Sequence, residues 1–271
     1  MKKRLIITGH DLGYSSAVNA GFDYAITKLP KVYSELSLLP NNEGLSLQAA
    51  EIAKASGIST LLSISLVSSK LKSLSGAPSL TGADGNLKNA PNVSQWDFSV
   101  IDTYTPEDIE LEIAAQYQWF LDTMGHKPSA IVTQKGEHGD PKILEPMIRL
   151  AKKEGLPMRA PLWQWQANYG AQSLVESEGI KTTSQFFVGF KDWQNGAGYD
   201  LETDYEVLCA KINAVHGVSE LAVFTGFCDA DLIDMTSVSW QRGQLLNILK
   251  RKYHLIERLY REFDVITYSD L

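Results

Sequence analysis

The chain has 271 residues, of which 44% are hydrophobic and 21% are charged. Both values are typical of compact globular proteins, and a chain of this length can form a single α/β barrel. The formal net charge of −7 argues against nucleic acid or an anionic membrane surface as the main partner.

The start of the chain and its cysteines indicate the cellular compartment. The basic residues Lys2-Lys3-Arg4 precede an apolar run of only three residues, 5–7, which is too short for the core of a signal peptide. No other stretch approaches the length of a transmembrane helix. Cys209 and Cys228 lie far apart and form no CxxC or CxxH motif, so we expect neither a disulfide framework nor a structural zinc site. These features predict a cytoplasmic protein.

The first predicted element is a short strand over residues 4–8, which leads into the polar pair His10 and Asp11. A glycine follows, and Ser15-Ser16 can cap a helix over residues 17–27. In parallel α/β folds, chemistry takes place at the C-terminal ends of the strands, so the pattern predicts that His10 and Asp11 lie in a pocket. The alternative is that Asp11 only caps the helix and His10 is a hydrogen-bonded loop residue.

Strands and helices alternate along the rest of the chain. The clearest helix begins after Thr105, with Pro106 at its first position, and ends at Gly125. Segment 68–100 is rich in Ser, Gly, Pro and Asn without a period, which is typical of a functional loop. The alternation predicts a single α/β domain over residues 1–271, a distorted (β/α) barrel with a mainly parallel sheet. Further strands are predicted at 32–39, 59–67, 130–133, 158–160, 186–190, 220–225 and 265–268, and further helices at 45–55, 143–154, 202–215 and 240–263.

Several motifs occur in a characteristic order over almost the whole chain. His10-Asp11-Leu12-Gly13 looks like an Asp-Asp-Phe-Gly motif, and Gly155-Leu156-Pro157-Met158-Arg159-Ala160-Pro161 is similar to Gly-Ile-Pro-x-Arg-x-Pro. Segments 128–141, 220–229, 240–242 and 266–271 complete the match. Together they resemble the YdjC/ChbG family of carbohydrate deacetylases, whose fold is a distorted (β/α) barrel.

The resemblance implies a reaction and a metal. In this family a divalent metal (Mg or Zn) is held by the second aspartate of the opening pair and by two histidines. The first aspartate acts as general base, and a histidine before Pro-Gly acts as acid, in hydrolysis of the N-acetyl group of amino-sugar oligosaccharides. Carried over to this chain, the metal-binding aspartate is Asp11 and the base position is His10.

The remaining positions of that machinery are replaced. The two histidine ligands fall on Ser63 and Gln134, with Val132 where an aspartate is usual, and the acid position is Phe224. A divalent ion needs anionic or imidazole ligands, and phenylalanine cannot transfer a proton. We therefore expect no tightly bound metal and a lost or altered activity, with these side chains converging at the C-terminal ends of the strands.

His10 has more than one interpretation. It could pair with Asp11, or with Glu137 and His138, and act as a general base near neutral pH. The alternative is that its neutral ring only fills the metal position. His138 precedes a Gly139-Asp140 turn and is expected at the surface or at the rim of the pocket, where it would contact substrate. Metal binding by His138 with Glu137 or Asp140 is the less favoured interpretation.

Two arginines and three aromatic residues are further candidates for substrate binding. Arg159 and Arg242 could each hold a carboxylate of the protein or an anionic group of a ligand, and for Arg159 an ion pair within the protein is favoured. Trp163 and Trp165, with Tyr169, follow a predicted strand end at a spacing that does not fit one helix face. Such aromatic side chains suit a saccharide cleft, whereas core packing or contact with a second subunit in a homodimer is the alternative.

Two functional classes follow. The first is a deacetylase-family enzyme with an altered site that acts on a small saccharide or an acetylated amino sugar. The second is a non-catalytic relative that binds a saccharide or another partner. No Gly-x-Ser-x-Gly elbow, Walker motif or dinucleotide fingerprint supports a different class of enzyme.

Overall fold

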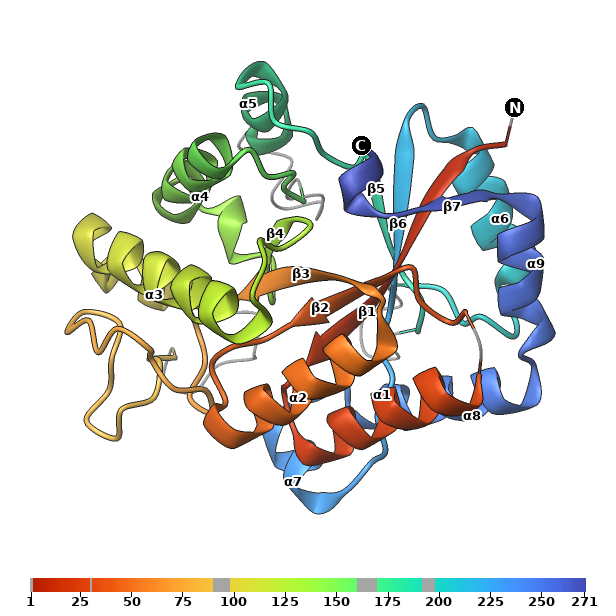
Figure 1. Cartoon of the computed structure of the whole chain (residues 1–271), viewed down its shortest axis with the longest axis horizontal. Helices are drawn as coiled ribbons and strands as arrows, with labels where there is room; N and C mark the ends of the chain where they lie inside the picture. Colours follow the sequence, from red (N-terminus) through yellow and green to blue (C-terminus); the bar gives the residue numbers. More distant parts are fainter. Residues whose placement is uncertain (1, 30, 90–97, 160–169, 192–197) are drawn as a thin grey trace.

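The computed structural model describes residues 2–29, 31–89, 98–159, 170–191 and 198–271. Seven strands alternate with helices in this part of the chain (Figure 1). The strands are β1 (Arg4–Leu12), β2 (Glu35–Leu38), β3 (Ser59–Ile64), β4 (Ile131–Thr133), β5 (Gln185–Val188), β6 (Val218–Val223) and β7 (Asp264–Ile266). The helices are α1 (Ser16–Lys28), α2 (Glu43–Ser56), α3 (Pro106–Met124), α4 (Pro141–Glu154), α5 (Ala171–Ser177), α6 (Tyr205–Ala214), α7 (Ala230–Met235), α8 (Ser239–Arg251) and α9 (His254–Glu262).

The strands form one parallel sheet in the order β4-β3-β2-β1-β6-β5. β7 pairs with the first residues of β1, whereas β2 pairs with its last residues, so β1 has different neighbours along its length. Beyond β4, Met158 forms a single bridge to Ile131, and its N–H donates to the carbonyl of Lys181. The sheet curls into a half-barrel with the helices on its outside (Figure 1). This confirms the predicted single α/β domain with a parallel, barrel-like sheet.

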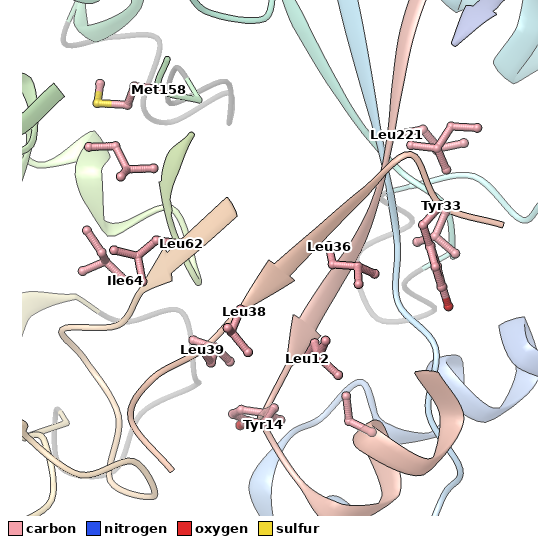
Figure 2. Close-up of a cluster of buried hydrophobic side chains, with 14 of the residues drawn as sticks. Leu12, Tyr14, Tyr33, Leu36, Leu38, Leu39, Leu62, Ile64, Met158 and Leu221 are labelled. Atoms are coloured by element: carbon pink, nitrogen blue, oxygen red, sulfur yellow. The ribbon is translucent and has the colours of Figure 1, made fainter. Parts of the chain in front are cut away.

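The outer face of the sheet carries the main hydrophobic core. Alternate side chains of the strands, such as Leu36 and Leu38 of β2 and Leu62 and Ile64 of β3, are buried there with Leu12 of β1 (Figure 2). The helices contribute their apolar faces to the same core. Because successive side chains of a strand point to opposite faces, the other set lines the inner, concave face.

The inner face, which we call the lumen, is partly polar. At one end a small apolar cluster contains Ile6, Leu61, Val218 and Tyr268. Further along the strands the buried lumen side chains include the polar residues Thr8, His10, Ser63 and Glu220, and Glu35 is buried at the end of the apolar cluster, next to Tyr268. Burying polar groups costs free energy unless they are hydrogen-bonded, so a polar lumen points to a site rather than to a second core.

The long loop after β3 is tied to α3 by carboxylates, chiefly that of Glu112, and Asp108 accepts from the backbone N–H of Ser79. Glu112 accepts hydrogen bonds from the backbone N–H groups of Leu74 and Ser75 and from the hydroxyl groups of Ser73 and Ser75. Short antiparallel bridges at Lys72 and at Thr81 organise the rest of residues 68–89. Residues 90–97 of the predicted functional loop lie outside the described residues.

Three details of the predicted elements are wrong. The helix expected over 240–263 is two helices, α8 and α9, separated at Lys252 and Tyr253. The last strand ends at Ile266, and Tyr268–Asp270 forms a 3₁₀ turn, η4. Of the strand expected at 158–160, the described residues 158 and 159 contain only the single bridge of Met158, and residue 160 lies outside the described part of the chain. Within the described part of the chain, no helix is both long enough and apolar enough to cross a membrane, as the sequence predicts.

Candidate functional site

The backbone at the end of β1 turns two neighbouring side chains toward each other. In a regular strand His10 and Asp11 would point to opposite faces. Asp11 instead has φ of 74°, in the left-handed region, and the pairing with β2 shifts register between Gly9 and Leu12. Aspartate tolerates this conformation better than most residues. As a result, His10 Nδ1 lies 2.8 Å from Asp11 Oδ1.

Both oxygens of Asp11 are engaged by protein groups. Oδ1 accepts from His10, and Oδ2 forms an ion pair with the guanidinium of Arg242, on α8. Burial acts to raise the pKa of the Asp11 carboxyl, but the contacts with His10 and Arg242 outweigh it and hold the pKa well below its ordinary value. Asp11 is therefore an ionised carboxylate whose charge is already compensated within the protein.

Both ring nitrogens of His10 are engaged as well. Arg159 Nη1 lies 3.0 Å from His10 Nε2. Because a guanidinium can only donate, Nε2 must accept and the ring proton lies on Nδ1, which donates to Asp11. On one side the ring stacks against Phe224, with 4.7 Å between the ring centroids. The geometry therefore fixes His10 in one neutral tautomer.

Arg159 connects His10 to the far end of the lumen. Its Nε donates to Glu220 Oε2 at 2.7 Å, and its Nη2 pairs with the other oxygen of the same carboxylate. Glu220 also accepts from the hydroxyl of Thr8 at 2.6 Å and from that of Tyr268 at 2.5 Å. Burial tends to raise the pKa of Glu220, whereas Arg159 and these hydrogen bonds lower it below its ordinary value. This confirms the ion pair within the protein that was favoured for Arg159.

The guanidinium of Arg242 lies near two aromatic rings, and some of its N–H groups have no acceptor in the described structure. Its guanidinium carbon lies 5.2 Å from the ring centroid of Phe224 and 5.7 Å from that of Tyr14. Nη2 binds Asp11, whereas Nε and Nη1 are buried and have no hydrogen-bond partner among the described residues. Buried N–H groups without acceptors are costly, so the Nε and Nη1 donors of Arg242 indicate a binding site for a ligand with acceptor atoms.

Ser63 and Gln134 occupy neighbouring strand ends. Ser63 lies on β3 and its buried hydroxyl has no partner in the described structure, whereas Gln134 directly follows β4 and its Oε1 accepts from Ser65 at 3.0 Å. Lys135 comes next in the chain. His10, Asp11, Ser63 and Gln134 thus lie at the C-terminal ends of parallel strands, with Phe224 just beyond β6 in contact with His10. Arg242 and His138 lie on other elements.

His138 lies inside the protein rather than at the surface or rim. It is 1% exposed, its Nδ1 contacts the Thr133 hydroxyl, and its Nε2 lies 2.8 Å from the carbonyl oxygen of Arg159. Burial, reinforced by the charge of Arg159, lowers the pKa of His138 to about 3. His138 is therefore neutral and supports the backbone of Arg159. Trp163 and Trp165, proposed above as an aromatic platform, and Tyr169 lie outside the described residues.

Three residues of this network were missed from the sequence. Glu220, Tyr268 and Lys135 were read only as parts of motifs, with no role assigned to them. Glu220 carried a usable signal, because a carboxylate within a continuous apolar strand needs a buried cation. Lys135 and Tyr268 follow strand ends and carry no such signal.

A separate cavity lies at the opposite end of the sheet. It has a volume of about 640 Å³ and is lined by Lys54, Lys127, Lys181 and the N-terminal end of β3. The C-terminal ends of α2 and α4 also border it at two glycines in the left-handed conformation, Gly57 and Gly155, and that of α3 borders it at Met124. Lysines are favourable beside helix C-termini, and Lys127 donates to the last carbonyl of α4, at Glu154. Lys54 and Lys127 therefore have a structural explanation that requires no ligand.

Comparison with known proteins identifies the family. The pattern that defines the YdjC-like proteins matches residues 4–269, so the chain belongs to this family. A carbohydrate deacetylase of Brevibacillus brevis (strain 47) is 26% identical over 276 residues, which cover 99% of this chain and 99% of that protein. A chitooligosaccharide deacetylase of Salmonella typhi is 24% identical over 267 residues, which cover 96% and 97% of the two chains.

The fold is shared with a solved structure. A crystal structure of a proposed cellobiose-phosphate cleavage protein from Enterococcus faecalis V583 superposes with a TM-score of 0.81 at 23% identity. The superposition covers 100% of this chain and 99% of that one. At this level of identity the likeness establishes the half-barrel fold.

Proposed function

We propose that this chain is a saccharide-binding member of the YdjC family that does not carry out the family's metal-dependent deacetylation. The observation that carries the proposal is the state of Asp11, the one carboxylate kept at the family's metal position. Its two oxygens are held by His10 and by Arg242.

The donor set around Asp11 does not fit a resident divalent metal. Ser63 and Gln134 offer a hydroxyl and a carboxamide where the family has two imidazoles, and Gln134 Oε1 already accepts from Ser65. A guanidinium on the remaining carboxylate adds positive charge next to the position a metal ion would take. Among the described residues, no three His, Cys, Asp or Glu side chains are grouped so that they could hold a metal ion. Divalent ions lose their water shell only where anionic or imidazole ligands replace it.

The site also lacks a general acid and an accessible general base. The position of the family's acid is Phe224, and His10 at the base position has its accepting nitrogen bound by Arg159 at 3.0 Å. A general base must face the proton that it removes. His10 and Asp11, proposed above as catalytic, are better explained as a rigid, charge-compensated wall of a binding site.

Saccharide binding is supported by the relatives and by the chemistry of the lumen. The two relatives described above are named for reactions on carbohydrates. Near His10 the ring of Phe190 meets Phe224 edge-on at 5.1 Å, and both rings are half-buried. Sugar ligands combine hydroxyl groups, which hydrogen-bond to polar side chains, with apolar C–H faces that lie against aromatic rings.

The proposal is tested with purified, dialysed protein. We expect elemental analysis to find no stoichiometric zinc, nickel, cobalt or manganese. We also expect no acetate release from di- to hexameric chito-oligosaccharides with added Mg²⁺ or Zn²⁺, and saccharide binding by calorimetry. Phe224→Ala should weaken that binding, whereas Phe227→Ala, an exposed phenylalanine three residues further along, should not. Metal-dependent acetate release, or an absence of binding to every saccharide at millimolar concentration, would overturn the proposal.

A further inference from the structure

We infer that the lumen binds an anionic group, the carboxylate or phosphate of a sugar, at the place where the family's relatives hold a cation. That the ligand is a sugar rests on the proposed function. That the ligand carries a negative charge does not, because it follows from the donors of the site. The carboxylates of this site already accept hydrogen bonds from protein groups, whereas some N–H groups of its cationic side chains have no acceptor.

Arg242 provides the strongest of these donors. It has one N–H on Nε and two on Nη1, all buried and without partners in the described part of the chain. The rings of Phe224 and Tyr14 lie near its guanidinium and help to fix its position. Nε and Nη1 lie on different edges of the planar guanidinium, so each of them can donate a charge-assisted hydrogen bond to an oxygen of a carboxylate or phosphate.

Lys135 provides a second cation. Its Nζ donates to the carbonyl of Val67 at 2.9 Å, and no carboxylate of the described residues lies within ion-pair distance of it. Lys135 directly follows Gln134 at the C-terminal end of β4, next to the strand end that carries Ser63. Burial lowers the pKa of Lys135, whereas the charges of Glu137 and Asp11 act in the opposite direction. An ammonium group has three N–H donors, so Lys135 retains donors for a ligand.

The acidic groups nearby do not offset these donors. Asp11 is bound by Arg242, and Glu220 is bound on both oxygens by Arg159. Glu137 accepts from the backbone N–H of Lys135 at 2.9 Å, and burial raises its pKa. The hydroxyl of Ser63 is a further donor without a partner. A ligand that completes the site must bring acceptors, and hydrogen bonds from cations to anions are about twice as strong as those between neutral groups.

The side of the site that is open to solvent fits the same ligand. Gln134, Lys135 and Phe224 are half-buried, whereas Asp11, His10 and Arg242 lie deeper. A sugar ring could therefore lie against Phe224 while its anionic substituent reaches the arginine. A divalent cation or a protonated amine would instead face Arg242 and Lys135.

The test compares sugars that differ in charge. Calorimetry at low ionic strength uses glucuronate, glucose 6-phosphate and neutral N-acetylglucosamine, with inorganic phosphate and acetate as sugar-free anions. We expect at least one anionic sugar to bind about 10- to 100-fold more tightly than the neutral sugar, the factor expected from one or two additional charge-assisted hydrogen bonds. Glucuronate and glucose 6-phosphate distinguish a carboxylate from a phosphate.

Variants assign the effect to the site. Lys135→Met and Arg242→Met should each remove most of the preference for the anionic sugar, and Arg251→Met, on the exposed part of α8, should leave it unchanged. Lys135→Met keeps the Arg242–Asp11 pair and serves if Arg242→Met does not fold. Equal or tighter binding of the neutral sugar, or an anion preference that survives both variants, would overturn the inference. Binding of sugar-free phosphate or acetate that depends on Arg242, without binding of any sugar, would support the anion site and contradict the saccharide function.

Discussion

Asp11 shows how one residue changes what a strand can present. Its left-handed backbone, with φ of 74°, brings two neighbouring side chains of β1 into contact. The carboxylate then meets a guanidinium from α8, 231 residues further along the chain. Breaking a buried ion pair by removing one charge is costly, because the remaining charge has lost both water and its partner.

Replacing Asp11 by asparagine isolates that charge. An asparagine tolerates the same backbone conformation, but its neutral amide leaves Arg242 buried without a counterion. We expect Asp11→Asn to lower the free energy of unfolding by about 3–5 kcal/mol, measured by urea unfolding followed by tryptophan fluorescence. The double variant Asp11→Asn/Arg242→Met should recover much of the loss, since neither charge remains. A single variant as stable as the parent protein would show that the pair contributes nothing.

The sequence predicts the strand that ends in His10 and Asp11, but not the ion pair or the backbone conformation of Asp11. A strand followed by His10 and Asp11 was recognisable, because a short apolar run ending in polar residues is a local pattern. Arg242 was a candidate for holding a carboxylate, but its pairing with Asp11 was not predictable, because that contact depends on how β6, α7 and α8 return to the end of β1. The left-handed conformation of Asp11 was equally hidden, since aspartate also adopts ordinary strand geometry.

At the level of single elements, the first residue of β2 carries an unusual carboxyl group. Glu35 is fully buried at the lumen end opposite to Asp11 and accepts hydrogen bonds from the Ser129 hydroxyl and the Tyr268 backbone N–H. Burial raises its pKa from 4.5 to about 7, in spite of these hydrogen bonds. The folded protein therefore retains a proton on Glu35 at pH values where the unfolded chain has lost it.

This shift makes the stability of the protein depend on pH. With the pKa raised in the folded state, the contribution of Glu35 is fully present below pH 4.5 and declines as the pH rises to about 7. Its size over that range is about 3 kcal/mol. We expect Glu35→Gln, which cannot ionise, to flatten the curve of unfolding free energy between pH 4.5 and 7 relative to the parent. Ser129 can rotate its hydroxyl to accept from the new amide. Parallel curves for the two proteins would contradict the raised pKa.

The break between α8 and α9 shows why element boundaries are hard to predict. Apolar residues continue through it at helical spacing, from Leu245 and Leu249 to Ile256 and Leu259, and neither Gly nor Pro marks the position. The spacing of these apolar residues therefore predicted a single helix. In the folded protein the chain turns at Lys252, and α9 then leads directly into β7, which pairs with the start of β1.

Across the whole molecule, one chain of polar contacts runs along the lumen from end to end. It passes from Glu35 through Tyr268, Glu220 and Arg159 to His10, and then through Asp11 to Arg242. Such networks hold their members in fixed positions when every group is satisfied. Tyr268 is the residue of the C-terminal turn that closes this chain at the floor of the half-barrel.

Removing the hydroxyl group of Tyr268 should therefore change the environment of His10, at the other end of the lumen. Tyr268→Phe keeps the ring but removes the 2.5 Å hydrogen bond to Glu220, and we expect a loss of about 1.5–3 kcal/mol in the free energy of unfolding. The ¹⁵N NMR signals of the His10 ring should also shift, because Glu220 then holds Arg159 less firmly. Tyr24→Phe, on α1, is the control. Unchanged His10 signals in a destabilised Tyr268→Phe protein would show that the contacts do not act as one network.

The pairing of β1 also bears on the order in which the protein is made. This strand is synthesised first, yet Arg4 pairs with Val218 of β6 and with Asp264 of β7. β2 can pair with the end of β1 early, but the partners of residues 4–6 in β6 and β7 are synthesised more than 200 residues later. Until then the apolar side chains of β1 and its unpaired backbone are open to wrong partners, and pairings between such distant residues form slowly. The unfinished sheet is accordingly exposed to aggregation for longer than one whose strands all pair with sequence neighbours, however stable the finished half-barrel is.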